Sequence, residues 1–211
     1  MDTVNLRTII ANAEHHEQQT GELSQLLRSR LHSLHCTIAP RSSELLDFVT
    51  QYVRRLPDIL DALRELNALQ GTEDRAEALA NSCGELFARP PPLLQGHLGL
   101  NGAMSSAYLA HRLIEETSDH HLVVHGLVLI PLDSTRSNLV IHQLIGESFA
   151  NQLDSAVSLL SSDLISGWAP PSSAAGQKAP SATLTKALIQ RWPCLQDSLA
   201  GDIFRLPPAI H

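Results

Sequence analysis

The chain has 211 residues and a formal net charge of −7, and 43% of its residues are apolar. This length allows one sizeable hydrophobic core, and the apolar fraction is that of an ordinary globular protein. Residues 1–164 hold 20 of the 22 Asp and Glu but only 11 of the 15 Lys and Arg. No basic strip is therefore available to contact phosphates, and nucleic-acid binding is not expected.

The cysteines and the apolar runs narrow the class of protein further. Cys36, Cys83 and Cys194 are far apart and form no C-x-x-C pair, so neither a disulfide framework nor a thiolate zinc site is expected. The N-terminal segment turns polar before a signal peptide could form, and no uninterrupted apolar run of about 18 residues occurs. These features predict a cytoplasmic protein that does not bind membranes.

Three helices are predicted in the first half of the chain. Residues 3–35 carry apolar side chains at three- and four-residue steps, although Gly21 weakens the middle of this helix. A second helix is predicted over residues 44–69, where Pro57 should kink or split it because proline has no backbone N–H. A third helix, over residues 73–88, begins with acidic residues that suit the N-terminal end of a helix dipole.

The next segment contains several glycines and then β-branched residues. Residues 93–116 are predicted to be helical, and small residues form a line along which another helix can approach closely: Gly96, Gly99, Ala103, Ala107 and Ala110. Residues 122–132 (LVVHGLVLIPL) are rich in β-branched residues and predict an extended segment. This segment could form a hairpin about Gly126, a buried connection, or a strand paired with a second copy of the chain.

The last part of the chain predicts one long helix, a linker and a short helix. Apolar residues keep helical spacing over residues 134–164, straight through Gly146. Residues 166–182 are dominated by Gly, Pro, Ala and Ser, which is typical of a flexible linker. A last helix follows and contains Trp192.

These elements predict a mainly α fold. We expect a bundle of about five or six helices over residues 1–165, with a short extended or β-like insertion near residues 122–132. The linker over residues 166–182 then leads to a C-terminal helix and tail, residues 183–211, which could dock on the bundle.

Histidines are concentrated in one part of the sequence, where six of the eleven lie between residues 97 and 142. Histidine titrates near neutral pH and is the commonest metal ligand, so the cluster marks candidate sites. Steps of three and four place one polar stripe on a single helix face: His97, Asn101, Met104, Tyr108, His111 and Glu115. This stripe can be a solvated face, a buried hydrogen-bond network, or the wall of a ligand pocket. The candidate ligand-binding residues are His97, Asn101, Tyr108, His111 and Glu115.

A metal site is the alternative use of these residues. His142 falls in the middle of the apolar face of its helix and His16 lies near that of the first helix, where a satisfied core histidine is the competing interpretation. Mixed imidazole and carboxylate ligands would suit zinc or iron, and the candidate set is His16, His111, Glu115 and His142. No Glu-x-x-His pair occurs, which argues against the ferritin-like di-iron class. No other cofactor is expected. The remaining clustered histidines are predicted to face solvent in a loop: His120, His121 and His125.

No complete catalytic motif accompanies the histidines. Residues 146–150 (GESFA) match a nucleophile elbow in letters only, because helical spacing runs through them and the only later histidine is the last residue. No dinucleotide, phosphate-loop or H-E-x-x-H motif occurs, so an enzyme is not the first expectation. The sequence favours a cytosolic protein-interaction or regulatory module that self-associates, because it offers a small-residue line, an apolar segment and a tethered terminal helix. The alternative is a metal- or small-molecule-binding helical bundle, which could be an enzyme, with inward-facing His and Glu residues.

Overall fold

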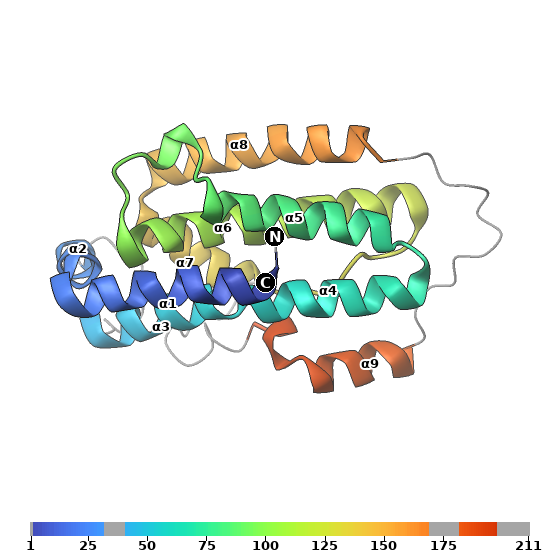
Figure 1. The fold of residues 1–211 in the computed structure, drawn as a ribbon, viewed down its shortest axis with the longest axis horizontal. Helices are drawn as coiled ribbons and strands as arrows, with labels where there is room; N and C mark the ends of the chain where they lie inside the picture. The colour runs from blue at the N-terminus through green and yellow to red at the C-terminus, as the bar shows by residue number, and fades with distance from the viewer. Residues whose placement is uncertain (1, 32–40, 169–181, 198–211) are drawn as a thin grey trace, which may run out of the picture.

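The computed structural model describes residues 2–31, 41–168 and 182–197, and the fold of these residues is helical throughout (Figure 1). The elements are α1 (Thr3–Thr20), α2 (Glu22–Arg30), α3 (Ser42–Arg54), α4 (Leu56–Gln70), α5 (Glu73–Ala88), η2 (Pro92–Leu94), α6 (Gly99–His125), α7 (Thr135–Ile145), α8 (Glu147–Ser166), α9 (Ala182–Arg191) and η3 (Pro193–Leu195). The prediction of a mainly α fold is confirmed, while the helices are more numerous than the five or six expected.

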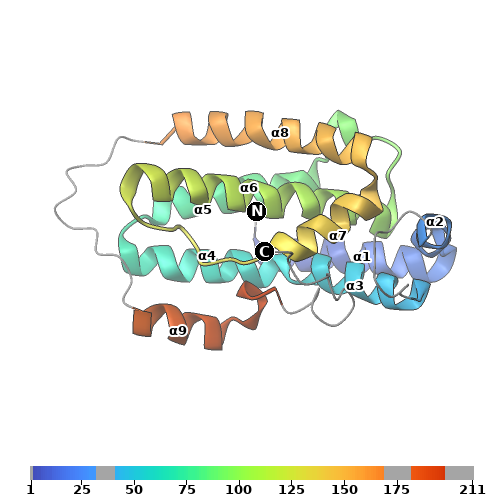
Figure 2. The same cartoon turned by 180° about the vertical axis from the view of Figure 1, so that it is seen from behind.

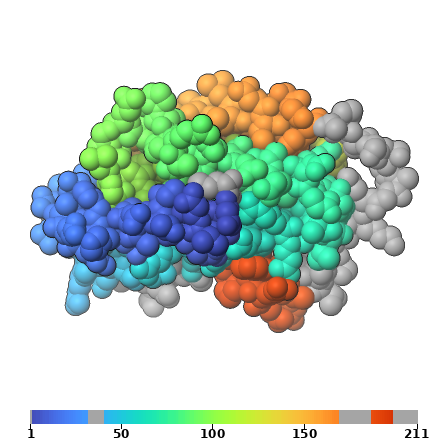
Figure 3. Space-filling view, viewed as in Figure 1, coloured from blue at the N-terminus to red at the C-terminus, as the bar shows by residue number. Residues whose placement is uncertain are grey.

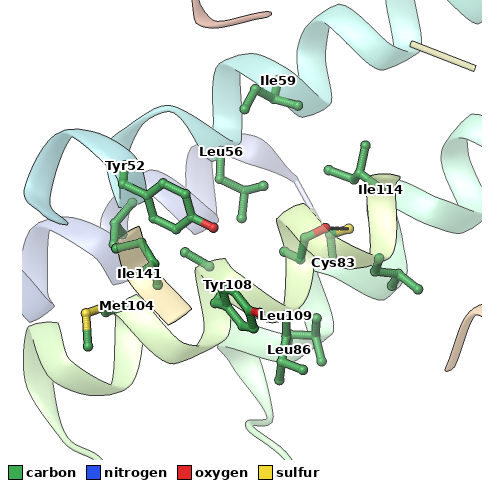
Figure 4. Close-up of a cluster of buried hydrophobic side chains, with 14 of the residues drawn as sticks. Tyr52, Leu56, Ile59, Cys83, Leu86, Met104, Tyr108, Leu109, Ile114 and Ile141 are labelled. Atoms are coloured by element: carbon green, nitrogen blue, oxygen red, sulfur yellow. Dashed lines mark hydrogen bonds between the residues drawn. The ribbon is translucent and has the colours of Figure 1, made fainter. Parts of the chain in front are cut away.

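Helix α6 is the centre of the bundle. It packs against α1, α3, α5, α7 and α8, so neighbours surround it on nearly every side (Figures 1 and 2). A helix in this position carries apolar side chains around most of its circumference rather than along one stripe. Figure 4 shows Tyr52, Leu56 and Ile59 of the α3–α4 region facing Tyr108 and Ile114 of α6. The small-residue line predicted for docking another helix lies here, and Ala107 and Ala110 are completely buried within this chain.

Three predicted helices are divided in two, each at a residue that resists helical continuation. Gly21 ends α1 in the left-handed conformation, with φ of 65°. Pro57 stands at the start of α4, where its missing N–H costs no helical hydrogen bond. The prediction of one helix over residues 134–164 is wrong, because Gly146 separates α7 from α8 with φ of 98°. A backbone with this φ favours glycine and cannot continue a right-handed helix.

The extended or β-like insertion predicted near residues 122–132 is also wrong. Residues up to His125 continue α6, which ends at Gly126 in the left-handed conformation, with φ of 70°. Residues 127–134 then form a connection without regular secondary structure, which returns past α4 to α7 (Figure 2). The connection is anchored because Leu129 is completely buried and its carbonyl accepts a hydrogen bond from Asn67 Nδ2 at 2.8 Å. β-branched residues lower helix stability by only a few tenths of a kcal/mol each, and this small cost did not end α6 before His125.

The described part of the C-terminal segment packs on the bundle. Glu65 of α4 holds it twice, through an ion pair to Arg191 at 2.8 Å and a hydrogen bond from Trp192 Nε1 at 3.0 Å. Leu195 is buried, and its carbonyl accepts the backbone N–H of Asp133 at 2.9 Å. In Figure 3 this segment lies on the opposite edge of the molecule from α8. Most of the predicted linker, residues 169–181, and the tail from residue 198 onward lie outside the described residues.

Candidate functional site

A cavity of about 550 Å³ opens between α6, α7, α8 and the 127–134 connection. We call it the acidic pocket. Its size falls within the range of about 300–1,000 Å³ that is typical of small-molecule sites. Its polar lining comprises Tyr108, Arg112, Glu115, Ser118, Asp119, Thr135, Asn138, His142 and Asp154, and its apolar lining comprises Ile114, Val128, Ile130, Pro131, Leu132 and Leu139.

Arg112 is held between two carboxylates on one wall of the acidic pocket. Its Nη1 donates to Glu115 Oε2 at 2.7 Å, one turn further along α6, and its Nε donates to Asp154 Oδ1 of α8 at 3.2 Å. Burial by itself would lower the pKa of Arg112, but these two bonded carboxylates raise it above its usual value. The guanidinium therefore stays charged and ties α8 to α6.

Tyr108 points toward the same carboxylate. Its hydroxyl donates to Asp154 Oδ1 at 2.9 Å and lies 3.2 Å from Oδ2. Burial, followed by the negative charge of Asp154, raises the pKa of Tyr108 well above its usual value. The phenol is therefore a neutral donor near pH 7 and not a base.

A chain of hydrogen bonds runs from the acidic pocket into the core. Ser134 Oγ donates to Glu115 Oε1 at 2.5 Å, and Asn138 Nδ2 donates to Ser134 Oγ at 3.2 Å. The buried hydroxyl of Tyr52 on α3 donates to Asn138 Oδ1 at 2.6 Å. Buried polar groups that are all paired fix a single arrangement of their side chains, so this wall of the pocket is preorganised.

His142 lies at the edge of the acidic pocket and not in the core where its helical position placed it. Its side chain is 24% exposed, and its Nε2 lies 3.2 Å from Asn151 Oδ1 and 3.8 Å from Asp154 Oδ2. The ring presents an edge contact to Tyr108 at 6.1 Å between centroids. The prediction that His142 is a core residue is wrong, because the buried face of α7 is centred on Ile141, Leu144 and Ile145 and His142 lies at its margin.

His111 is buried on a different side of α6 from the acidic pocket. Its ring stacks on Tyr52, with centroids 4.3 Å apart, and neither ring nitrogen has a hydrogen-bond partner among the described residues. Burial, followed by the positive charge of Arg55, lowers the pKa of His111 to about 3. This imidazole is therefore neutral at pH 7.

The two other candidate ligand-binding residues lie near the start of α6. His97 precedes the helix, whose first residue is Gly99, and its ring packs on Phe149 at 4.8 Å between centroids. Asn101 lines a small cavity of about 220 Å³ beside Arg30. The predicted ligand wall is therefore divided: Tyr108 and Glu115 share the acidic pocket, whereas His97, Asn101 and His111 lie elsewhere.

The predicted metal ligands do not converge. Glu115 and His142 line the acidic pocket, His111 is enclosed against α3, and His16 lies in a separate cavity at the start of α6. Within the part of the chain that the structure describes, no three His, Cys, Asp or Glu side chains are arranged to hold a metal ion. The mixed zinc or iron site built on these four residues is therefore not formed.

His121 is the most tightly bound of the three histidines predicted to lie in a solvent-facing loop. All three are helical, and His121 is completely buried, so the prediction is wrong for this residue. Arg75 Nη1 lies 2.8 Å from its Nε2, and the Leu127 carbonyl oxygen lies 2.7 Å from its Nδ1. Since arginine can only donate, Nε2 must accept and Nδ1–H must donate to Leu127. Both nitrogens are thus used to fix the start of the connection.

Sequence reasoning missed Arg112 and Asp154 as site residues. Arg112 lies next to the predicted stripe, and its i,i+3 spacing from Glu115 was a usable signal. Asp154 had no comparable signal, because its place in the pocket depends on the register of α8 against α6. A pairing between residues 42 positions apart in sequence is set by tertiary packing and not by local pattern.

Searches of family models, of curated proteins and of solved structures gave no match to this chain. Within the described ranges, no helix combines the length and the apolar character needed to cross a bilayer. The fold and the site therefore define only a class, an all-helical bundle with a polar-walled cavity beside its central helix.

Proposed function

We propose that this protein binds a small organic cation, an amine with an apolar body, in the acidic pocket. The observation that carries the proposal is the charge of the lining, which has three carboxylates, Glu115, Asp119 and Asp154, and a single guanidinium, Arg112. The carboxylates outnumber the guanidinium, so the lining is net negative. A partly enclosed cavity strengthens the attraction of such a lining for a cation, because its walls have a lower dielectric constant than water.

The hydrogen bonds of the wall support the same class of ligand. Tyr108 and Ser134 direct their hydroxyl protons at carboxylates, and Arg112 directs two of its N–H groups at them. Each oxygen of Glu115 accepts one of these bonds and keeps a further lone pair, since a carboxylate has about four acceptor positions. A ligand that donates, such as an ammonium group, can use these positions.

The opposite wall is suited to the apolar body of such a ligand. Val128, Ile130 and Leu132 of the connection and Leu139 of α7 face the cavity. Burying apolar area contributes roughly 25 cal/mol per Å², so a hydrocarbon chain on this wall adds affinity that the charge alone does not supply.

Self-association is a second candidate, favoured by one surface. Leu122, Val123 and Val124 at the end of α6 are consecutive apolar residues and are 44%, 84% and 54% exposed. Other features that suggested an interaction module, the small-residue line and the described part of the terminal segment, pack within this chain and so lend it less support. Sedimentation velocity of the purified protein tests it: a strict monomer at high concentration rules it out.

The amine proposal is tested with three probes of equal chain length, hexylamine, hexanol and hexanoate. Titration of ¹⁵N-labelled protein with hexylamine should shift the amide resonances of Ser118, Leu132 and Thr135, with hexanol weaker and hexanoate weakest. The Asp119→Asn variant should weaken hexylamine binding about two- to fivefold, because an exposed charge pair contributes roughly 0.5–1 kcal/mol.

Asp163→Asn is the matched control, because Asp163 is exposed on α8 and does not line the pocket. It changes the net charge equally and should leave hexylamine binding unchanged. The proposal fails if hexylamine shifts none of the pocket amides, or if hexanol binds as tightly as hexylamine.

A further inference from the structure

A second cavity, of about 400 Å³, lies at the start of α6, between α1 and the end of α5. We call it the histidine pocket, because His16 of α1 and His97 both line it. Its other walls are largely apolar and include Ile9, Phe87 and Leu94. Among the described residues, no Asp, Glu, Lys or Arg side chain lines this cavity, and its polar lining consists of the two imidazoles with Asn12 and Ser106.

The two imidazoles each have a buried nitrogen that makes no hydrogen bond among the described residues. His16 Nε2 and His97 Nδ1 have almost no solvent-exposed surface and make no hydrogen bond among the described residues. The His16 side chain as a whole is 38% exposed, and Glu22 Oε2 lies within ion-pair distance of its Nε2, at 3.5 Å, without forming a hydrogen bond. Buried polar atoms almost always have partners, and an unpaired one costs roughly 1–3 kcal/mol, so two of them on residues that line one cavity support a ligand that bonds to both.

Two glycines allow both histidines to approach the first turn of α6. A Cβ on Gly99 would come within 2.3 Å of His16 Cδ2, and Gly99 has φ of 54°, a conformation that favours glycine. A Cβ on Gly102 would come within 2.3 Å of the His97 carbonyl oxygen. The positions of the His16 imidazole and of the His97 backbone therefore depend on residues without a side chain, which is the use of glycine where close approach is needed.

The surroundings of the two nitrogens favour an acidic group on the ligand. An imidazole N–H can donate a hydrogen bond to a carboxylate oxygen, and the two imidazoles are the titratable groups among the described residues of the lining. The positive charge of Arg30 on α2 is close enough to His97 to contribute, after burial, to the lowered pKa of His97. The start of the 27-residue helix α6, where Leu98 provides no side-chain cap, adds a favourable dipole.

We propose that the histidine pocket binds an apolar carboxylic acid, with its carboxylate accepting hydrogen bonds from His16 and His97 and its hydrocarbon part against Ile9, Phe87 and Leu94. This site is separate from the acidic pocket and does not depend on the amine-binding function. The two cavities share no lining residue. The protein would therefore distinguish an alkyl acid from an alkyl amine by the place at which each one binds.

The test uses the same probes with the roles reversed. Hexanoate should shift the amide resonances of Ala13, Gly102 and Ala103 and the ring-nitrogen resonances of His97, whereas hexylamine should leave them unchanged. His97→Leu keeps an apolar side chain against Phe149 and should weaken hexanoate binding about fivefold or more, because it removes one of two hydrogen-bond donors. His15→Leu, on the exposed side of α1, is the control and should bind hexanoate as the wild type does.

A second variant tests the cavity without removing a histidine. Ala13→Leu places a larger side chain on the lining and should reduce hexanoate binding while circular dichroism and thermal unfolding remain close to wild type. The proposal is overturned if hexanoate shifts no amide of the histidine pocket, if hexanol binds there equally well, or if His97→Leu binds hexanoate like the wild type. Each of these results is independent of hexylamine binding at the acidic pocket.

Discussion

The acidic pocket and the histidine pocket lie beside the same helix, α6, but their polar groups are satisfied in opposite ways. In the acidic pocket, Arg112, Glu115 and Asp154 bond to one another and to hydroxyl groups. In the histidine pocket, His16 Nε2 and His97 Nδ1 make no hydrogen bond among the described residues. The hydrogen bonds of the acidic pocket thus form without a ligand, whereas the two histidine nitrogens of the other pocket are left without a hydrogen bond.

This difference predicts two kinds of recognition. A wall whose polar groups are already paired attracts a ligand through the net charge and the spare lone pairs of the wall. This attraction discriminates only modestly between ligands, and salt screens it. A wall with unmet donors rejects a ligand that cannot fill them, because the desolvated nitrogens then stay unpaired. We therefore expect amine binding to weaken with added salt more than acid binding does.

The largest expected effect concerns the pH dependence of unfolding, through His111, which is buried in α6 between the two pockets' elements and lines neither pocket. The pKa of His111 is lowered to about 3 in the folded protein, below the unfolded value of about 6.5. Below pH 6.5 the unfolded chain binds a proton that the folded protein does not, so the free energy of unfolding should fall by ~1.4 kcal/mol per pH unit. At pH 4 this loss amounts to about 3 kcal/mol, and at pH 7 it is absent.

His111→Phe keeps an aromatic ring against Tyr52 and removes the titration. Urea unfolding at pH 7, 5 and 4 should show a shallower pH dependence in this variant than in the wild type. Equal dependences in the two proteins would show that His111 is not the acid-sensitive group. In that case, any loss of probe binding in acid would need to be assigned to the pockets themselves.

A smaller effect is expected from substitution of Asn67. This residue anchors the 127–134 connection, which lines the acidic pocket but not the histidine pocket. Asn67 is completely buried, donates to the carbonyls of Leu63 and Leu129, and accepts a bond from Thr72 at 2.5 Å. Asn67→Ala leaves the Leu129 carbonyl and the Thr72 hydroxyl unpaired, and should cost about 2 kcal/mol of unfolding free energy in urea. Hexylamine binding should fall, while hexanoate binding should be kept.

An exposed asparagine on another helix provides the control for this substitution. Asn5 lies on the solvent side of α1 and lines neither pocket. Asn5→Ala should change the free energy of unfolding by no more than about 0.5 kcal/mol, through helix propensity alone, and should leave the binding of both probes unchanged. A parallel loss of hexylamine and hexanoate binding in Asn67→Ala would mean that the two pockets are not independent.

The positions of most helices could be predicted from the sequence, whereas their ends could not. Apolar spacing located the helices that became α1, α3, α5 and α8, because each has an inner and an outer face. The helical spacing of apolar residues continues through Gly146 in the sequence. It therefore did not reveal the break in the backbone between α7 and α8 at this residue. Val123 and Val124 suggested a strand, but they are the exposed end of a helix that stops at Gly126.

The candidate site was predictable only in part, because α6 is surrounded. Helical steps correctly placed Tyr108 and Glu115 near one another, and both border the acidic pocket. The same spacing also included His111. This residue is rotated about 100° around the helix from Arg112, so its ring packs on Tyr52 of α3 and not in the acidic pocket. On a surface helix, a rotation of about 100° moves a side chain from the core to the solvent. On a central helix such as α6, the same rotation moves it from one neighbouring helix to another, and the sequence does not identify these neighbours.

The smallest effect concerns Arg112, whose guanidinium lies between two carboxylates of the acidic pocket. Arg112→Met leaves Glu115 and Asp154 without their shared partner, and should cost about 1 kcal/mol of unfolding free energy, since both groups are partly exposed. It also makes the lining more negative, so hexylamine affinity should rise about threefold in low salt and return toward the wild-type value in high salt.

Arg136→Met, at an exposed position on α7, removes the same charge from outside the lining and should change neither quantity. Hexanoate binding at the histidine pocket should be the same in both variants, because Arg112 does not line that cavity. A fall in hexylamine affinity in Arg112→Met would mean that Arg112 positions the carboxylates for the amine instead of competing with it, and preorganisation rather than net charge would then decide recognition in the acidic pocket.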